Sequence, residues 1–251
     1  MTVQITDLER ALYDTWTSDE STRIAGWTLH SNGGFTRRVN CATAVGSPGT
    51  DPEAFGAIST WLAERGGAPI VRVTPLLSDE TVAAVSTEWG YRSFDDTVVM
   101  TGPVTAVASS GSIEVVPVTD EGFFADINVL NQRAPSSKPA WRRLLGRIED
   151  RAAGLRLPGI GVALVAASGR VAEVYSVAVA PDARRRGVAS SLMNTATAWA
   201  VERGCDTMSL QVLGTNDAAL ALYDRLGYRE VYRYHYLQPQ EEELGAQIDG
   251  C

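Results

Sequence analysis

The stretch from Val177 to Tyr223 constrains the fold more than any other part of this 251-residue chain. It reads as a strand, a basic loop with one glycine, an amphipathic helix, a second strand and a short helix. The loop places Arg184, Gly187 and Ala189 in an R-x-x-G-x-A pattern before the helix. Backbone N–H groups beside small residues can approach phosphate oxygens at the positive end of the helix dipole. With a strand before the loop and a helix after it, the pattern predicts a pyrophosphate site.

A second motif lies on the short helix downstream. Asn216 begins the segment NDAALALYDRLGY, and Gly227 ends it. Asn216 and Tyr223 are seven residues apart, which is close to two helical turns, so both side chains lie along one face. Two interpretations stay open. Either Asn216 caps the helix and Tyr223 packs in a core, or both residues contact a ligand.

Taken together, residues 171–237 resemble the GNAT superfamily of acyl-CoA-dependent N-acetyltransferases. The resemblance is carried by the strand AEVYSVAVAP, the loop RRRGVA, the helix through Trp199, and the N-x-x-A-x-x-L-Y-x-R-x-G-Y block from Asn216 to Tyr228. These linked motifs occur in the order found in the family. The resemblance implies acetyl-CoA as acyl donor, an amine as acceptor and an α/β fold, with no metal.

The resemblance also implies which residues hold the cofactor. Backbone groups from Val177 to Val179 would contact the pantetheine arm and the acyl carbonyl, and residues 185–190 would bind the pyrophosphate. Tyr223 would lie near the sulfur and protonate the departing thiolate. The expected cofactor-binding residues are Val177, Ala178, Val179, Arg184, Arg185, Arg186, Gly187, Val188, Ala189, Ser190 and Asn216.

Glu173 is the candidate for the base that removes a proton from the amine. Strict alternation along its strand places it on the same face as Tyr175, Val177 and Val179. The segment is similar to the strand that carries the catalytic glutamate in the histone-acetylating branch of the superfamily. Because four residues of strand span about 13 Å, Glu173 is expected to act through water. The alternative interpretation is a solvated carboxylate near the start of a strand.

An internal repeat predicts two copies of one fold. The segment TWLAERGGAPIVRV, from Thr60, is similar to AWAVERGCDTMSLQV, from Ala198, with matching residues 138 positions apart. WGYR, from Trp89, matches LGYR, from Leu226, at an offset of 137. A repeat of half the chain indicates two domains rather than a solenoid, whose repeats span roughly 20–50 residues.

The first copy lacks the phosphate-binding features of the second. The offset maps the R-x-x-G-x-A loop onto Gly46, Gly49 and Asp51. A carboxylate at Asp51 suits the helix dipole but repels an anion by roughly 1 kcal/mol at close range. Tyr223 maps onto Ser86, which has no phenol. We therefore expect a degenerate first copy without its own cofactor, which walls the substrate cleft or stabilises the second copy.

We predict an α/β fold of two tandem GNAT-like mixed-sheet domains, the second of which carries the acyl-CoA site. The predicted parts are a degenerate domain at 1–101, a linker at 102–112, a catalytic domain at 113–238 and an acidic tail at 239–251. The elements expected before the linker are a helix near 3–15, strands near 24–30 and 35–45, a helix from Asp51-Pro52, strand 70–74, helix 79–89 and strand 92–100. Those expected after it are strand 113–118, helices near 120–132 and 139–152, and a hairpin before Glu173 that looks short.

The composition of the chain limits the kinds of ligand and partner that we expect. A net charge of −8 and a pI near 4.9 disfavour nucleic acid, which needs a basic surface. Two histidines and three cysteines without C-x-x-C spacing predict no metal site, and Cys41 and Cys205 are expected to pack in cores. We expect a cytoplasmic protein without a signal peptide or membrane span, since cysteines are few and residues 1–10 lack a basic region followed by an apolar run. The oligomeric state is left open.

Three functions stay open. The first is an N-acetyltransferase that moves an acetyl group from acetyl-CoA to the primary amine of a small molecule. The second is a protein lysine or N-terminal acetyltransferase, which uses the same chemistry on a larger acceptor. The third is a non-enzymatic acyl-CoA-binding module, because a fold can be kept for binding alone.

Overall fold

A computed structural model of the protein describes residues 3–105 and 112–239. All eleven strands within these ranges join one mixed sheet, in the order β1-β2-β3-β4-β11-β5-β10-β9-β8-β7-β6. The pairs β3–β4 and β9–β10 are parallel, and the other pairs are antiparallel. The predicted α/β class with mixed strand directions is therefore confirmed. The predicted acidic tail lies outside the described residues, apart from Pro239.

The first half of the chain follows the predicted order of helices and strands closely. Its elements are α1 (Ile5–Thr15), β1 (Glu20–Ile24), β2 (Trp27–Ser31), the 3-10 turn η1 (Arg37–Val39), β3 (Ala42–Thr43), α2 (Pro52–Ala63), β4 (Val71–Val73), α3 (Asp79–Thr87) and β5 (Tyr91–Pro103). Helix α2 begins where Asp51-Pro52 predicts it, because the Asp51 carboxylate accepts a hydrogen bond from the Ala54 N–H at 2.9 Å. Strand β5 runs to Pro103, two residues into the predicted linker.

Two predicted strands of the first half differ from the structure. The strand expected near 24–30 is present as β2, but it begins only at Trp27 and pairs with β1 in a hairpin that turns at Ala25 and Gly26, both of which have positive φ angles (49° and 88°). The strand expected at 35–45 is a loop that contains η1 and only the two residues of β3. The Asn40 side chain accepts hydrogen bonds from the Asn32 and Gly34 N–H groups, at 3.0 Å each, and so folds this segment back on itself.

The second half of the chain contains a longer early sheet than the sequence suggests. Its elements are β6 (Glu114–Val116), α4 (Glu121–Leu130), α5 (Lys138–Arg147), β7 (Ala152–Leu157), β8 (Gly161–Ser168), β9 (Val171–Val179), α6 (Val188–Glu202), β10 (Thr207–Leu213), α7 (Asp217–Arg225) and β11 (Arg229–Pro239). The hairpin before Glu173 is full length, so the expectation of a short one is wrong. Strand β7 is rich in small residues because Phe123 packs directly on it; a Cβ at Gly154 would lie 2.6 Å from that ring.

The internal repeat is visible in the helices and strands. Helices α3 and α7 are both nine residues long and begin at 79 and 217, a difference of 138, and β5 and β11 begin at 91 and 229, also 138 apart. With this offset, the residue equivalent to Tyr223 is Val85 rather than Ser86. Val85 is buried and has no hydroxyl group, so the first copy still lacks a phenol at this position.

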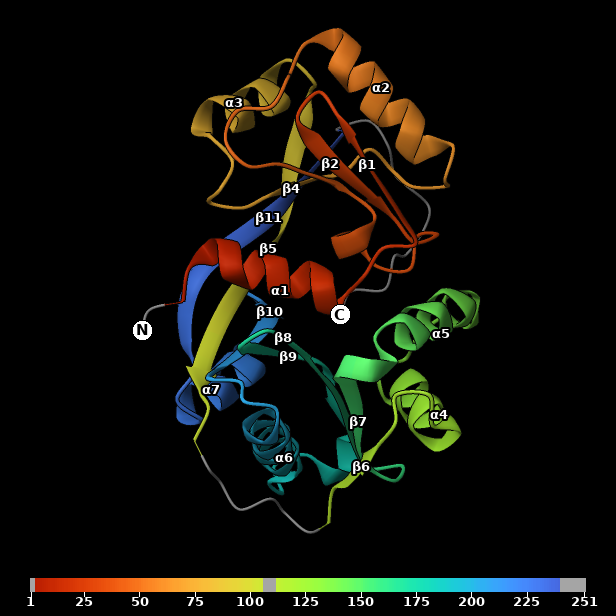
Figure 1. Ribbon diagram of the computed structural model, residues 1–251, viewed down its shortest axis with the longest axis vertical. Helices are drawn as coiled ribbons and strands as arrows, with labels where there is room; N and C mark the ends of the chain where they lie inside the picture. The colour runs from red at the N-terminus through yellow and green to blue at the C-terminus, as the bar shows by residue number, and fades with distance from the viewer. Residues whose placement is uncertain (1–2, 106–111, 240–251) are drawn as a thin grey trace.

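The two copies exchange their last strands. Strand β11 of the second copy lies between β4 and β5 of the first, and β5 of the first copy lies between β11 and β10 of the second. In Figure 1, β5 and β11 run together through the middle of the molecule, between α2 and α3 on one side and the helices of the second copy on the other. Because each copy contributes a strand to the sheet of the other, the two copies share one continuous sheet.

Helix α1 of the first copy also packs into the hydrophobic core of the second copy. One face of the second copy is covered by α6 and α7, through residues such as Leu192 and Trp199. The other face is covered by α4 and α5 together with Leu12 and Trp16 of α1. The Trp16 ring lies 4.5 Å from the ring of Tyr175 on β9, centroid to centroid. The first copy therefore packs directly on the strand that the sequence predicts to be catalytic. Of the helices in the described ranges, none is long and apolar enough to cross a membrane.

Candidate active site

The site is built where β9 and β10 separate. Their parallel ladder pairs Val171 with Thr207 and ends at Val174 and Leu210, although β9 continues to Val179 and β10 to Leu213. A cavity of about 140 Å³ opens beside this separation. Its lining residues are Thr36, Arg37, Arg38, Asp95, Thr97, Asn131, Val174, Tyr175, Ser176, Val177, Gln211, Val212, Leu213, Asn216, Ala219, Tyr223, Tyr234 and Tyr236.

A bulge at Ser176 marks the place where β9 changes course. Ser176 has a φ of 54°, and the register between β8 and β9 shifts by one residue here. The end of α4 holds the bulge in place: Asn131 Nδ2 donates to the Ser176 carbonyl at 3.3 Å, and Arg133 Nη2 donates to Ser176 Oγ at 2.7 Å. A positive φ strains the backbone of a non-glycine residue, so the contacts around Ser176 must stabilise this conformation.

The bulge corrects one prediction. Strict alternation places Glu173, Tyr175, Val177 and Val179 on one face, but the extra residue reverses the pattern after Ser176. Val177 and Val179 pack on the face covered by α6, whereas Tyr175 packs on the opposite face, with α1. Glu173 is therefore on the face of Tyr175 and not on that of Val177 and Val179.

The predicted phosphate loop has the backbone geometry that an anion site needs. Helix α6 is 15 residues long and begins after Gly187, whose φ of 82° is left-handed, and no side chain caps its first N–H groups. Arg185 also has a left-handed φ, 61°, while Arg184 Nε donates to the Val179 carbonyl at 3.3 Å and ties the loop to β9. The guanidinium groups of residues 184–186 are exposed. The start of α6 can therefore accept a diphosphate.

The first copy differs at the equivalent helix. There the Asp51 carboxylate occupies the start of α2 and satisfies the Ala54 N–H itself. A negative charge already sits where a phosphate would bind, so this helix suits no anion. Its geometry supports the expectation of a degenerate copy.

The interpretation of Asn216 as a helix cap and Tyr223 as a core residue is confirmed, and ligand contact by the pair stays a prediction. The Asn216 side chain caps α7 by accepting from the Ala219 N–H at 3.2 Å, and Tyr223 is buried in the core beside Tyr228. Yet both residues also line the cavity. Burial raises the pKa of the Tyr223 phenol to about 12, so it is protonated at neutral pH and can donate a proton.

Glu173 is buried beside the cavity rather than exposed to solvent. Only 1% of its surface is accessible, so the interpretation as a solvated carboxylate is wrong. Burial raises its pKa to about 7, while the neighbouring Ser209 hydroxyl and the Arg38 charge act in the opposite direction. Its Oε2 atom has no hydrogen-bond partner within the described part of the chain. The carboxyl group is therefore balanced between its two protonation states near neutral pH.

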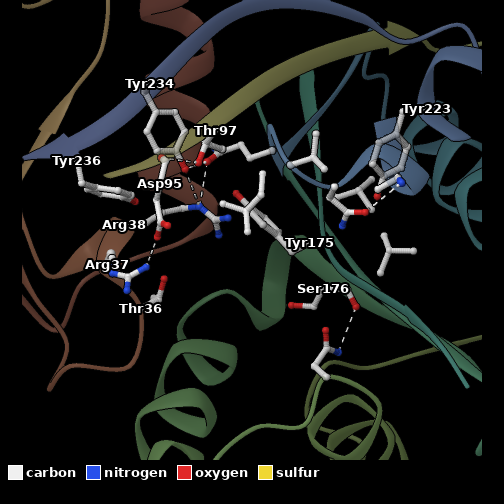
Figure 2. A pocket seen from close by; sticks show the side chains of 18 residues that line it. Thr36, Arg37, Arg38, Asp95, Thr97, Tyr175, Ser176, Tyr223, Tyr234 and Tyr236 are labelled. Atoms are coloured by element: carbon white, nitrogen blue, oxygen red, sulfur yellow. Dashed lines mark hydrogen bonds and ion pairs between the residues drawn. The ribbon is translucent and has the colours of Figure 1, made fainter. Parts of the chain in front are cut away.

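Sequence reasoning missed the residues that the first copy supplies. Thr36, Arg37, Arg38, Asp95 and Thr97 all line the cavity, and Figure 2 shows them gathered on the side opposite Tyr223. Arg37 forms an ion pair with Asp95, whose backbone has a φ of 52°. The signal available in the sequence was the adjacent pair of arginines at 37 and 38, which the strand prediction for 35–45 obscured.

The tyrosines of β11 have two roles. Tyr234 and Tyr236 line the cavity, and Tyr234 donates its hydroxyl proton to Gln211 Oε1 at 2.8 Å. Tyr232 lies deeper and donates to the Glu9 carboxylate, which also binds the fully buried Arg72 guanidinium at 2.9 Å. This buried group connects α1, β4 and β11, and so joins the two copies on the face that contains Glu173.

The cysteines pack as the sequence predicts. Cys41 and Cys205 are both buried, and burial raises the pKa of the Cys41 thiol to about 12, which makes it unreactive. Within residues 3–105 and 112–239, no group of three or more His, Cys, Asp or Glu side chains is arranged to hold a metal ion.

Comparisons with known proteins agree with this geometry. A family model described as "Probable histone acetyltransferase Rv0428c C-terminal" matches residues 2–237. The structure is similar to a GCN5-related N-acetyltransferase from Kribbella flavida (TM-score 0.70, 16% identity, 97% of this chain and 98% of that one). It is also similar to one from Sphaerobacter thermophilus (TM-score 0.56, 16% identity, 84% and 76%). A tandem GNAT protein from the clavulanic acid biosynthesis pathway matches at a TM-score of 0.58 and 12% identity, over 74% and 68% of the two chains. At 12–16% identity, these similarities show that the chain shares its fold with these proteins.

Proposed function

The chain belongs to the family of acetyltransferases described by that model, and on this premise we propose that it transfers an acetyl group from acetyl-CoA to the primary amine of a small molecule. The observation that carries the proposal is the cavity beside the separated ends of β9 and β10. It has a neutral phenol, that of Tyr223, in its wall, and a buried carboxyl group with a pKa of about 7, that of Glu173, lies on β9 next to the lining residue Val174. These are the acid and the base that the reaction needs.

The residues of the second copy fit acetyl-CoA, which would supply an activated acetyl thioester when bound. The first N–H groups of α6, at Val188, Ala189 and Ser190, would hold the diphosphate together with Arg185 and Arg186. Arg184 would keep the loop against β9, and the unpaired edge of β9 from Val177 to Val179 would hold the pantetheine arm. Asn216 and Tyr223 would lie at the sulfur end, because both line the cavity.

The proton transfers follow from the two pKa values. The ionised Glu173 carboxylate accepts a proton from the incoming ammonium group through water, which leaves a neutral amine able to attack the acetyl carbon. A backbone N–H of β9 near Val179 stabilises the negative charge that develops on the acetyl oxygen. As the carbon–sulfur bond breaks, the Tyr223 hydroxyl donates its proton to the sulfur, and the proton that the attacking nitrogen loses in forming the amide restores the phenol.

The small volume of the cavity, about 140 Å³, supports a small acceptor. Residues of the first copy line its far side, including the Arg37–Asp95 ion pair and Arg38. The main alternative is acetylation of a protein lysine or N-terminus, and the family description, which names a histone, favours it. A binding module without activity is the third possibility. The presence of Tyr223 in the cavity wall, and of Glu173 on the strand that contributes to that wall, argues against it.

The test combines binding with turnover. Mass spectrometry of the purified protein should detect retained acyl-CoA, and calorimetry should detect heat on addition of CoA. Thiol release from acetyl-CoA is then measured over a library of free amines, histone-tail peptides and peptides with free N-termini. We expect release with free amines. Release only with peptides would favour the protein acetyltransferase, and CoA binding without release would favour the module. Absence of heat at millimolar CoA would refute every form of the proposal.

A further inference from the structure

The charges at the cavity oppose one another. Among the lining residues, the cations are Arg37 and Arg38. Arg37 forms an ion pair with Asp95, which also lines the cavity. The charge of Arg38 acts on the buried Glu173 carboxyl group and lowers its pKa. Because each of these cations is opposed by a carboxylate, recognition of the body of the acceptor falls to neutral hydrogen-bonding groups.

The Gln211 side-chain amide is a neutral group whose orientation is fixed. Arg38 Nε donates to Gln211 Oε1 at 2.9 Å, and the Tyr234 hydroxyl donates to the same atom at 2.8 Å. A guanidinium nitrogen can only donate, so the atom that it meets is the amide oxygen. Both lone pairs of this oxygen are then in use, which leaves the amide nitrogen for a ligand. Figure 2 shows Arg38 and Tyr234, which hold this amide, away from Tyr223.

The Gln211 amide nitrogen faces the cavity. It donates to no residue in the described part of the chain and is not buried, and Gln211 is one of the lining residues. The ladder between β9 and β10 pairs Glu173 with Ser209, and alternation places Gln211 on the same face as Ser209. Leu210 packs on the other face, with Tyr223. The amide nitrogen therefore lies on the face of the candidate base, opposite that of the candidate acid.

We propose that Gln211 selects the acceptor by donating a hydrogen bond from Nε2 to a neutral oxygen, so that the substrate is an amine that also carries an ether, hydroxyl or carbonyl group. The inference rests on the proposed function and names its substrate class. An N–H group that a ligand encloses without a partner loses its hydrogen bonds to water. An acceptor with a methylene group at this point therefore binds less well than one with an oxygen.

The inference also assigns a role to the degenerate copy. Gln211 belongs to the second copy, but Arg38 of the first copy orients its amide. Arg38 is itself only 7% exposed, and its guanidinium carbon lies 5.5 Å from the ring centroid of Trp16, at the end of α1. A side chain that is already oriented loses little conformational entropy when it binds a ligand. The first copy thus positions a recognition residue that the second copy supplies.

The experiment uses pairs of amines in which an oxygen replaces one carbon. The pairs are 2-methoxyethylamine with butylamine, 3-methoxypropylamine with pentylamine, and ethanolamine with propylamine. Thiol release from acetyl-CoA by the full-length protein gives kcat/KM for each amine. The intrinsic reactivity of an amine is the same with every variant, so a change in the ratio within a pair reports a change in the protein.

Substitutions at Gln211 separate recognition from structure. Gln211→Glu keeps an oxygen for Arg38 and Tyr234 and replaces only the donor nitrogen, while its added charge acts on every ammonium alike. For the best pair, kcat/KM of the oxygen-bearing amine relative to the alkylamine should fall at least tenfold. Gln211→Met, which has no donor, should lower this ratio at least threefold. A loss that merely reflected poor folding would lower both members of a pair alike.

The matched control is Gln4→Glu. It makes the same chemical change at an exposed residue just before α1, outside the cavity lining, and should leave every ratio unchanged.

A binding measurement keeps recognition apart from turnover. Calorimetry with CoA-loaded protein compares the acetylated products of each pair, for example N-(2-methoxyethyl)acetamide and N-butylacetamide. The affinity of the oxygen-bearing product relative to the alkyl product should fall at least fivefold in Gln211→Glu. If no pair shows both falls, in kcat/KM and in affinity, the inference is overturned. Failure of the proposed function looks different: no thiol is released with any amine, by the wild type or by the variants.

Discussion

Replacing Glu173 with Gln tests the catalytic reasoning most sharply, because the burial that makes this residue a base also costs stability. Its pKa is about 7, whereas an unfolded glutamate titrates near 4.5. As a base it must be ionised, and its ionised fraction rises from about one tenth at pH 6 to about nine tenths at pH 8. In the wild type, kcat/KM should therefore rise about tenfold over this range. Glu173→Gln should remove the inflection and lower kcat/KM by roughly 10²-fold or more.

The same pKa shift has a consequence for stability with a definite sign. Between pH 4.5 and pH 7 the folded protein binds more protons at Glu173 than the unfolded chain does, so the free energy of unfolding falls as the pH rises. From pH 5 to pH 8 the loss is about 2 to 3 kcal/mol. Glu173→Gln should remove this dependence, and the pH sensitivity of its unfolding free energy should shrink by that amount.

The assays are thiol release across pH 5.5–9 and urea unfolding at pH 5 and pH 8. Ser209→Ala is the matched control: because the Ser209 hydroxyl lowers the Glu173 pKa, its removal should move the kinetic inflection to higher pH and keep its shape. A Glu173→Gln variant with an unaltered pH–rate profile would show that this residue is not the base. Unchanged pH dependence of unfolding would show that its folded pKa is ordinary.

Three further variants test other parts of the molecule. Tyr223→Phe should lower kcat by roughly 10²-fold and leave the Kd for CoA within twofold. Tyr228→Phe, which changes the neighbouring ring, should alter neither quantity. Equal effects of the two substitutions would show that Tyr223 is not the acid. Arg186→Gln, at the start of α6, should weaken CoA binding by about 1 kcal/mol in calorimetry, and Arg203→Gln, just beyond the end of the same helix, should not. Glu9→Ala should reduce the free energy of unfolding by about 3 to 5 kcal/mol, because it leaves the buried Arg72 charge without its carboxylate, and a loss below 1 kcal/mol in urea unfolding would refute this.

Local sequence signals were sufficient to predict structure that depends on residues close together in the chain. The Asp51 and Asn216 caps, the left-handed glycine before α6 and the helices at 79 and 217 all depend on neighbours within a few residues. The motifs from Glu173 to Tyr223 predict the strand, the loop and the helices that carry the candidate cofactor loop, acid and base, for the same reason. The strand at 35–45 was wrong because side-chain hydrogen bonds from Asn40 override the strand propensity of its neighbours.

The side of the cavity that the first copy lines depends on contacts between residues far apart in the chain. Arg38 meets Gln211 across 173 positions and Tyr234 across 196, and no periodicity or spacing encodes such a meeting. The bulge at Ser176, which turns Val177 away from the face of Glu173, is likewise set by packing against α4. Burial is the main cause that raises the pKa of Glu173 to about 7, and it depends on the packing of distant segments around this residue.

The sequence by itself determined the α/β class, the duplication, the strand–loop–helix unit of the candidate cofactor loop and the identity of the candidate acid and base, because each is a matter of local pattern. Only the tertiary structure decided that the two copies exchange strands and that Arg38 and Asp95 of the degenerate copy line the cavity. The physical reason is that strand pairing and charge burial depend on which distant segments come together, and that is settled by the packing of the whole sheet.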